Sequence, residues 1–340
     1  MKEADADDRP KSRTRHELTP LATRRSGGTI GGHTTVDAPA PDVGASVNQR
    51  GHVLPSDYWS WQGQDTPWYT KLRQADRHIA HLRREVEQFR DATPYTLKPE
   101  ATDIPGRYAY RLRYTRPIPV DFSAIVGDVL NNLRAALENV AYEIARRGQD
   151  GSLRPDQESV PQFPICATPD EFADFFRSAK RKALYSEQAQ AALRIVQPFA
   201  NAEMALEAGD ELWRSYEEEA IYSQLYRLHK LWNIDKHRRL TIMIWWLKIA
   251  YWTSNGETSR RYTPTGNKPE DGAILFHMDG EDEGFGTDVH HQFNLVLADD
   301  PAFIDSPMAD DDVIDLLSGW HQHIAGYVIP RVFTSIPVGQ

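Results

Sequence analysis

Apolar residues recur every three or four positions between Trp68 and Phe89, with polar residues between them. This spacing places the apolar side chains on one stripe of a helix. The stripe consists of Trp68, Leu72, Ala75, Ile79, Leu82, Val86 and Phe89. Thr93-Pro94 ends the pattern, because a residue that precedes proline is disfavoured in the helical conformation. The sequence therefore predicts a long amphipathic helix in this region.

A different period follows between Arg107 and Thr115, where aromatic or aliphatic residues alternate with mostly basic ones ("RYAYRLRYT"). A period of two predicts a half-buried strand, here with a basic outer face. Apolar runs at residues 240–253, 273–277 and 292–298 predict three further strands. We therefore expect an antiparallel sheet of about four strands.

Three more long helices are predicted: residues 121–147, residues 211–236, and the final stretch "ADDDVIDLLSGWHQHIAGYVIPRVF". Asp121 is a good N-cap for the first of them. Shorter helices are expected after the capping residues Thr168 and Ser186. The predicted fold is thus α+β, with a helical core of about four longer helices packed with the antiparallel sheet.

The helix predicted at residues 121–147 carries an unusual polar face. The arc opposite its apolar side holds Asp128, Asn131, Asn132, Glu138 and Asn139, with Arg134 at the margin. Asn and Asp are poor residues inside a helix, because their side chains compete with the backbone for hydrogen bonds. The face is therefore either an ordinary solvated surface or one that specific hydrogen bonds join to another segment.

A second polar cluster lies between two apolar runs in "RLHKLWNIDKHRRLTIMIWW". If the preceding helix continues through it, Asp235 lies on the apolar stripe and needs a partner. Asn233 and His237 are four residues apart and face together. The cations Lys236 and Arg238 stand at the end of the helix, where the helix dipole favours them. The cluster is either an internal polar clamp or a functional site.

The two polar segments have complementary groups. Arg134 could pair with Asp235, while Asp128 and Glu138 could pair with Lys236 or Arg238. We therefore expect the segments to meet across a helix–helix contact. Asp235 is expected to be a structural anchor, paired with a cation of the 121–147 helix or of residues 236–239.

The composition limits the class of protein. The chain has 340 residues, of which 40% are hydrophobic, so it can form a substantial core. Residues 1–54 are rich in Gly, Pro, Thr, Asp and Arg and are expected to form a disordered tail, while residues 55–340 form a single α+β domain. The net charge of −10 argues against a dedicated binder of duplex DNA, which needs a basic surface.

Other features indicate a cytoplasmic protein that has no membrane contact. Cys166 is the only cysteine, so no intramolecular disulfide can form. The N-terminus lacks the apolar segment of a secretory signal, and the run "LTIMIWWLKIAYW" is too short to span a bilayer. No histidine or acidic group has the spacing of a strong metal site, and no nucleotide-binding glycine loop is present, so neither a metal nor a cofactor is expected.

The two polar segments also carry a resemblance. "GDVLNNLRAALENVAYEIA" (127–145) and "LHKLWNIDKHRRL" (228–240) resemble two blocks of an uncharacterised bacterial and phage family, Gly-Asp-x-Leu-His-Asn-Leu-Arg-Ser-Ala-Leu-Asp-His and Asn-x-Asp-Lys-His-Arg. "PQFPI" (161–165) and "ALRIVQPF" (192–199) resemble the blocks between them. The likeness spans about residues 68–245, and it implies an architecture rather than an activity.

A looser resemblance is to HEPN-type helical domains, many of which are RNases with an Arg followed four to six residues later by His. The corresponding positions here are Arg134 and Asn139, and a second family histidine corresponds to Asn131. Asn233 and His237 match the Asn-x-x-x-His half of the motif, but Trp232 stands where Arg is expected. The resemblance therefore implies a degenerate motif.

We expect a non-enzymatic or degenerate HEPN-like module that binds a protein or RNA partner. The expected binding residues are Asp128, Asn131, Asn132, Asn139, Asn233, Asp235 and Arg238. The alternative is a metal-independent RNase of a defence or toxin system, with His237 as general base and with Arg134 and Lys236 holding the phosphate. The missing histidines favour binding, and the cluster at residues 233–238 favours catalysis.

Overall fold

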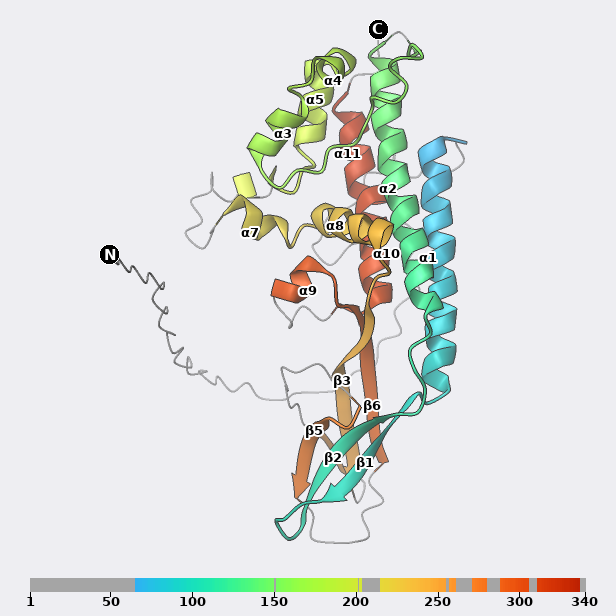
Figure 1. Cartoon of the computed structure of the whole chain (residues 1–340), viewed down its shortest axis with the longest axis vertical. Helices are drawn as coiled ribbons and strands as arrows, with labels where there is room; N and C mark the ends of the chain where they lie inside the picture. Colours follow the sequence, from blue (N-terminus) through green and yellow to red (C-terminus); the bar gives the residue numbers. More distant parts are fainter. Residues whose placement is uncertain are drawn as a thin grey trace, which may run out of the picture. The chain divides into compact units, whose positions relative to one another are not determined.

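The computed structural model describes residues 65–149, 151–200, 202–203, 215–254, 257–260, 271–279, 288–305 and 311–336 (Figure 1). The tail predicted for residues 1–54 lies outside these ranges, as do residues 55–64 of the domain predicted to follow it. The described part has an α+β fold, as predicted, and its strands pair in antiparallel fashion.

The two longest helices, α1 (Pro67–Asp91) and α2 (Asp121–Arg147), pack against each other (Figure 1). All seven residues of the stripe predicted for α1 are buried. Helix α2 begins at Asp121, with Val120 in the N-cap position, so Asp121 lies in the first turn instead of capping it. A carboxylate in the first turn is favoured by the helix dipole.

The strands form two sheets of three, not one sheet of about four. The first sheet has the order β1-β2-β5 and consists of β1 (Tyr95–Ala101), β2 (Arg107–Tyr114) and β5 (Ile274–Asp279). The second has the order β4-β3-β6 and consists of β3 (Ile242–Ser254), β4 (Glu257–Arg260) and β6 (Asp288–Leu297). Strand β3 pairs with β6 along one edge and, at residues 251–254, with β4 along the other. Strand β5 pairs with β2 and not with β3.

Short helices follow the predicted caps. The hydroxyl of Thr168 accepts a hydrogen bond from the Glu171 N–H at the start of α3 (Pro169–Phe175). Ser186 does the same for the Ala189 N–H in α5 (Glu187–Arg194). A further helix, α4 (Ala179–Leu184), lies between them. Both sequence predictions of a capped helix are therefore confirmed.

The helix predicted at 211–236 is interrupted. Residues 204–214 lie outside the described ranges, and the helices after them are α7 (Tyr216–Ala220) and α8 (Gln224–His237). A turn at residues 221–223 separates these two helices, with Ser223 in the N-cap position of α8. Ser is favoured at a helix start over a helix interior, which gives a physical reason for the break.

The C-terminal helix changes its geometry midway. It consists of α10 (Val313–His323), the π-helical segment η2 (Ile324–Val328) and α11 (Ile329–Thr334). The Ile329 N–H bonds to the carbonyl of Ile324, five residues back. Pro330 in the next turn has no N–H, and its ring would clash with the carbonyl four residues earlier in a regular helix. The wider turn relieves this conflict.

Buried apolar side chains of the described residues form one cluster that includes residues from α1 through α11. Arg227 of α8 enters this region and forms a bidentate ion pair with Asp300, which precedes α9 (Pro301–Asp305). Asp312 caps α10 and also pairs with Arg90 of α1 at 2.6 Å. These pairs connect helices that are distant in the sequence. No described helix has the length and apolar character needed to cross a membrane.

Candidate functional site

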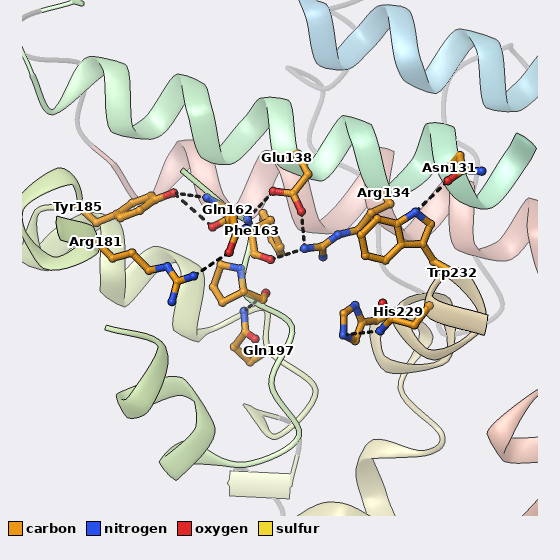
Figure 2. A network of polar contacts seen from close by, with 12 residues as sticks. Asn131, Arg134, Glu138, Gln162, Phe163, Arg181, Tyr185, Gln197, His229 and Trp232 are labelled. Atoms are coloured by element: carbon orange, nitrogen blue, oxygen red, sulfur yellow. Dashed lines mark hydrogen bonds and ion pairs between the residues drawn. The ribbon is translucent and has the colours of Figure 1, made fainter. Parts of the chain in front are cut away.

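Helices α2 and α8 meet through a chain of polar contacts. The carboxamide oxygen of Asn131 accepts a hydrogen bond from Trp232 Nε1 at 2.9 Å (Figure 2). Its Nδ2 donates to Asp235 Oδ2 at 3.3 Å. One Asn side chain on α2 therefore satisfies two side chains of α8. The two polar segments that the sequence predicted to meet do so at this point.

Gly127 allows this close approach. A Cβ atom at this position would lie only 2.6 Å from Asp235 Oδ1 and 2.7 Å from Oδ2. These distances are shorter than any real contact, so a larger residue would displace the carboxylate. A glycine one turn before Asn131 is thus what lets Asp235 lie against the surface of α2.

The partner of Asp235 differs from the prediction. We expected a cation, but Asp235 bonds to the neutral amide of Asn131, and no ion pair involves it among the described residues. Arg134 does not reach it, because Glu138 and the Phe163 carbonyl hold that guanidinium. Burial raises the pKa of Asp235, the Asn131 hydrogen bond acts against this, and the charge of Asp128 adds to the rise. Asp235 is therefore not the partner of a buried cation.

Arg134 and Glu138 form a clamp on the backbone of Phe163. Arg134 Nη2 donates to the Phe163 carbonyl at 2.9 Å and pairs with Glu138 Oε1, and Glu138 Oε2 accepts from the Phe163 N–H at 2.9 Å (Figure 2). Arg134 is only 6% exposed. The two residues are one helical turn apart, so α2 presents a donor and an acceptor to both polar groups of one peptide residue.

Further contacts fix the segment around Phe163. The buried Gln197 accepts from the Cys166 N–H and donates to the carbonyls of Pro164 and Leu193. Tyr185 exchanges hydrogen bonds with the backbone of Gln162 (Figure 2). The segment at 161–165 thus bonds to α2 through Phe163, and the segment at 192–199 bonds to residues 164 and 166 through Gln197. Their polar residues mainly hold the fold.

Trp232 lies among positive charges. The Nζ atom of Lys236 is 3.1 Å from the centroid of its ring, and Arg134 Cζ is 5.2 Å from a ring centroid of the same residue. The ring of His229 lies 6.0 Å away, centroid to centroid. Burial lowers the pKa of His229 to about 4, and the charges of Arg134, Lys230 and Lys236 contribute. His229 is therefore neutral at pH 7.

The other predicted binding residues have separate environments. Asp128 is exposed, and Asn132 Nδ2 donates to the Asp128 carbonyl within α2 at 2.8 Å. Asn139 is half-buried, with no described partner. Asn233 bonds to His229 Nε2 at 3.0 Å, and Arg238 pairs with Asp299 at 2.7 Å. The polar face of α2 is thus buried at Arg134 and half-buried at Glu138, and it is exposed at Asp128 and Asn131, although Asn131 bonds to α8.

The three residues of the predicted catalytic alternative do not form a group. His237 is exposed at the last position of α8, and no described residue bonds to it. Arg134 and Lys236 both contact Trp232, but Arg134 is buried in its pair with Glu138. No hydrogen bond, ion pair or ring contact joins His237 to either cation. Among the described residues, no group of three or more His, Cys, Asp or Glu could hold a metal ion.

Some site residues were missed by the sequence reasoning. His229 was not assigned a role, although its spacing of four residues from Asn233 predicts a contact on one helix face. Trp232 was noted as a departure from the motif, and its hydrogen bond to Asn131 was not predicted. The spacing of Arg134 and Glu138 also predicts their pair. The contact of these two side chains with Phe163 could not be predicted, because Phe163 takes part only through its backbone N–H and carbonyl.

Comparison of the chain with protein-family models, with curated proteins and with solved structures finds no match.

Proposed function

We propose that this chain is a non-catalytic, degenerate HEPN-like module that binds single-stranded RNA at the C-terminal end of α8. The observation that carries the proposal is a group of exposed basic side chains there: Lys236, His237, Arg238 and Arg239 are all exposed. Of these, Arg238 is paired with Asp299, and the others have no ionic partner among the described residues. We call Lys236, His237 and Arg239 the α8 basic end.

Charge favours a polyanionic partner at this surface. The whole chain has a net charge of −10, so the basic group at the end of α8 differs in charge from the chain as a whole. Phosphate groups are attracted to such a patch, and their binding releases counterions. Cations and aromatic rings also alternate along α8, since Lys230 lies 4.9 Å from the Tyr226 ring and Lys236 lies over Trp232. Aromatic rings beside cations suit bases and phosphates of a single strand.

Binding is favoured over cleavage by the state of the expected catalytic groups. RNA cleavage needs a general base and a cation at the phosphate. Arg134 is buried and neutralised by Glu138, and Asn131 and Asn139 occupy the positions of family histidines. Asn cannot take a proton at neutral pH. Among the described residues, no second acid–base group contacts His237.

The alternative function is a metal-independent RNase. It is favoured by one observation, the exposed His237 between Lys236 and Arg238. Such an enzyme would cleave RNA in EDTA, leave 2′,3′-cyclic phosphate ends, and lose its activity in His237→Ala while remaining folded. If these results are obtained, the alternative replaces the proposal.

The proposal is tested by the binding of a labelled single-stranded RNA, followed by fluorescence anisotropy at several salt concentrations. Replacing Lys236 and Arg239 together by Gln should weaken binding about tenfold or more and reduce the salt slope by about 1.4, since two phosphate contacts are lost. Replacing the exposed Lys180 and Lys182 of α4 by Gln changes the net charge equally and should leave binding unchanged.

Three results would contradict the RNA proposal. Wild-type protein that does not bind RNA removes its basis. Equal losses in the α8 and α4 variants would show that only the overall charge matters. A protein partner that is lost selectively in the α8 variant, with no RNA affinity, would transfer the proposal to that class of partner.

A further inference from the structure

Three buried nitrogen atoms near Trp232 have no hydrogen-bond partner among the described residues. They are Nε and Nη1 of Arg134 and Nδ1 of His229. Arg134 is 6% exposed, so its unpartnered atoms are shielded from solvent by the protein. Buried polar groups are almost always satisfied, and a group that is not satisfied indicates a missing partner or an unfavourable energy. These atoms therefore need an explanation.

The protonation of His229 can be assigned from its neighbour. Asn233 Nδ2 lies 3.0 Å from His229 Nε2, and an amide nitrogen can only donate, so Nε2 accepts. In a neutral imidazole the other nitrogen then carries the proton. Nδ1 of His229 is therefore an N–H donor. All three unpartnered atoms are donors, and the corner lacks an acceptor.

The acidic groups nearby cannot supply this acceptor. Both oxygens of Glu138 are used, one by Arg134 Nη2 and the other by the Phe163 N–H. The carboxamide of Asn131 is used by Trp232 and Asp235. The charges of Arg134, Lys230 and Lys236 all act on His229, so the electrostatic potential there favours an anion.

We propose that Arg134 and His229 form a binding corner for an oxyanion, a carboxylate or a phosphate group, beside the ring of Trp232. Both side chains contact this ring, with Arg134 Cζ at 5.2 Å and the His229 centroid at 6.0 Å from ring centroids of Trp232 (Figure 2). An oxyanion only accepts hydrogen bonds, so it matches a corner that only donates. The corner shares Trp232 with the α8 basic end, because Lys236 also lies over this ring, but its hydrogen-bond donors are Arg134 and His229, which the RNA proposal does not use.

Entry to the corner requires a side chain to move, because the unpartnered atoms are fully buried. Trp232 contacts both donor side chains and is itself only half-buried. Its hydrogen bond to Asn131 holds it in place. Trp232 is thus the covering residue, and the oxyanion reaches the donors when this ring is displaced.

The proposal is tested by thermal unfolding in sodium phosphate, sodium acetate and sodium chloride at equal ionic strength. An oxyanion well above its Kd should raise the midpoint of the wild-type protein by about 2–4 °C relative to chloride. The rise should be absent in His229→Phe, which keeps the ring but removes the donor. It should persist in His237→Phe, the control for an exposed imidazole on the same helix. General salt effects on stability act on all three proteins and cancel.

The two ions distinguish the source of the oxyanion. A rise with phosphate alone identifies a phosphate group, a rise with acetate alone identifies a carboxylate, and a rise with both identifies a general oxyanion site. A midpoint that rises specifically with neither ion overturns the proposal.

If His229→Phe does not fold, the wild-type protein still decides the question. Long-range ¹H–¹⁵N spectra of histidine-labelled protein report the tautomer of His229. The expected result is a proton on Nδ1, whose signal shifts on titration with phosphate or acetate and saturates. A proton on Nε2, or an Nδ1 signal that neither ion moves, would overturn the proposal.

Discussion

Arg134 is a buried cation whose charge is balanced by a single carboxylate. The Arg134 side chain is 8% exposed and the Glu138 side chain 31%. Burial lowers the pKa of Arg134, and Glu138 acts against this change. A buried ion pair adds little net stability compared with apolar residues, but removing one partner is costly because the other remains buried and charged.

We therefore expect Glu138→Gln to destabilise the protein by about 2–3 kcal/mol, less than for a fully buried pair because Glu138 is partly solvated. Gln keeps an oxygen that can accept from the Phe163 N–H, so the loss reports mainly the charge. Urea unfolding gives the free energy. Asp174→Asn is the control, since the Asp174–Arg177 pair is exposed on both sides and should change the stability by under about 0.5 kcal/mol. Equal effects of the two substitutions would show that Arg134 does not depend on Glu138.

At the scale of helices, the contact between α2 and α8 depends on the absence of a side chain at Gly127. In a helix interior Ala is normally more stable than Gly by about 1 kcal/mol. At Gly127 this gain is opposed, because the new methyl group would displace the Asp235 carboxylate and break its bond to Asn131.

We expect Gly127→Ala to be neutral or destabilising in the wild type. In an Asp235→Ala background the same change should stabilise by about 1 kcal/mol, so a double-mutant cycle gives a coupling of about 1 kcal/mol or more. Gly319→Ala in α10 is the control, because no atom lies within 4 Å of the added Cβ. It should stabilise in both backgrounds. Additive effects at Gly127 and Asp235 would contradict this account.

The helices were predictable because their patterns are local. The seven-residue stripe of α1 and the caps Thr168 and Ser186 depend on residues close in sequence. Strand β1 was missed because Pro99 interrupts its pattern. Proline is tolerated there because β1 is an edge strand with β2 on one side only. The division into two sheets was also missed, since it depends on which strands occupy the edges of β3.

The site was also predictable only in part, because some of its contacts join residues that are distant in the sequence. The meeting of the two polar segments followed from complementary residues, and the contact of Asn131 with Asp235 agrees with it. The identity of the pairs did not follow. Arg134 had two acceptors close by, Glu138 one turn away and the Phe163 carbonyl, and sequence patterns do not show backbone acceptors from a distant segment.

At the scale of the whole molecule, a half-buried imidazole links stability to pH. His323 lies at the end of α10, where its ring stacks on Tyr327 at 5.2 Å between centroids. Burial lowers the pKa of His323 to about 4 from an ordinary value of 6.5. The folded protein therefore holds the neutral imidazole, while the unfolded chain takes up a proton between these two values.

The sign of the pH dependence follows from proton uptake. Between pH 6.5 and about 4 the unfolded chain binds more protons at His323, so the free energy of unfolding falls as the pH is lowered through this range. The loss should be about 2 kcal/mol by pH 4.5. His323→Phe keeps the ring next to Tyr327 and should flatten the dependence by this amount, as measured by urea unfolding from pH 7.5 to 4.5. The exposed His237→Phe should leave the slope as in the wild type. A slope that is unchanged in His323→Phe would mean that this imidazole is protonated in the folded protein or is open to solvent, and the fall in stability would then arise from other groups.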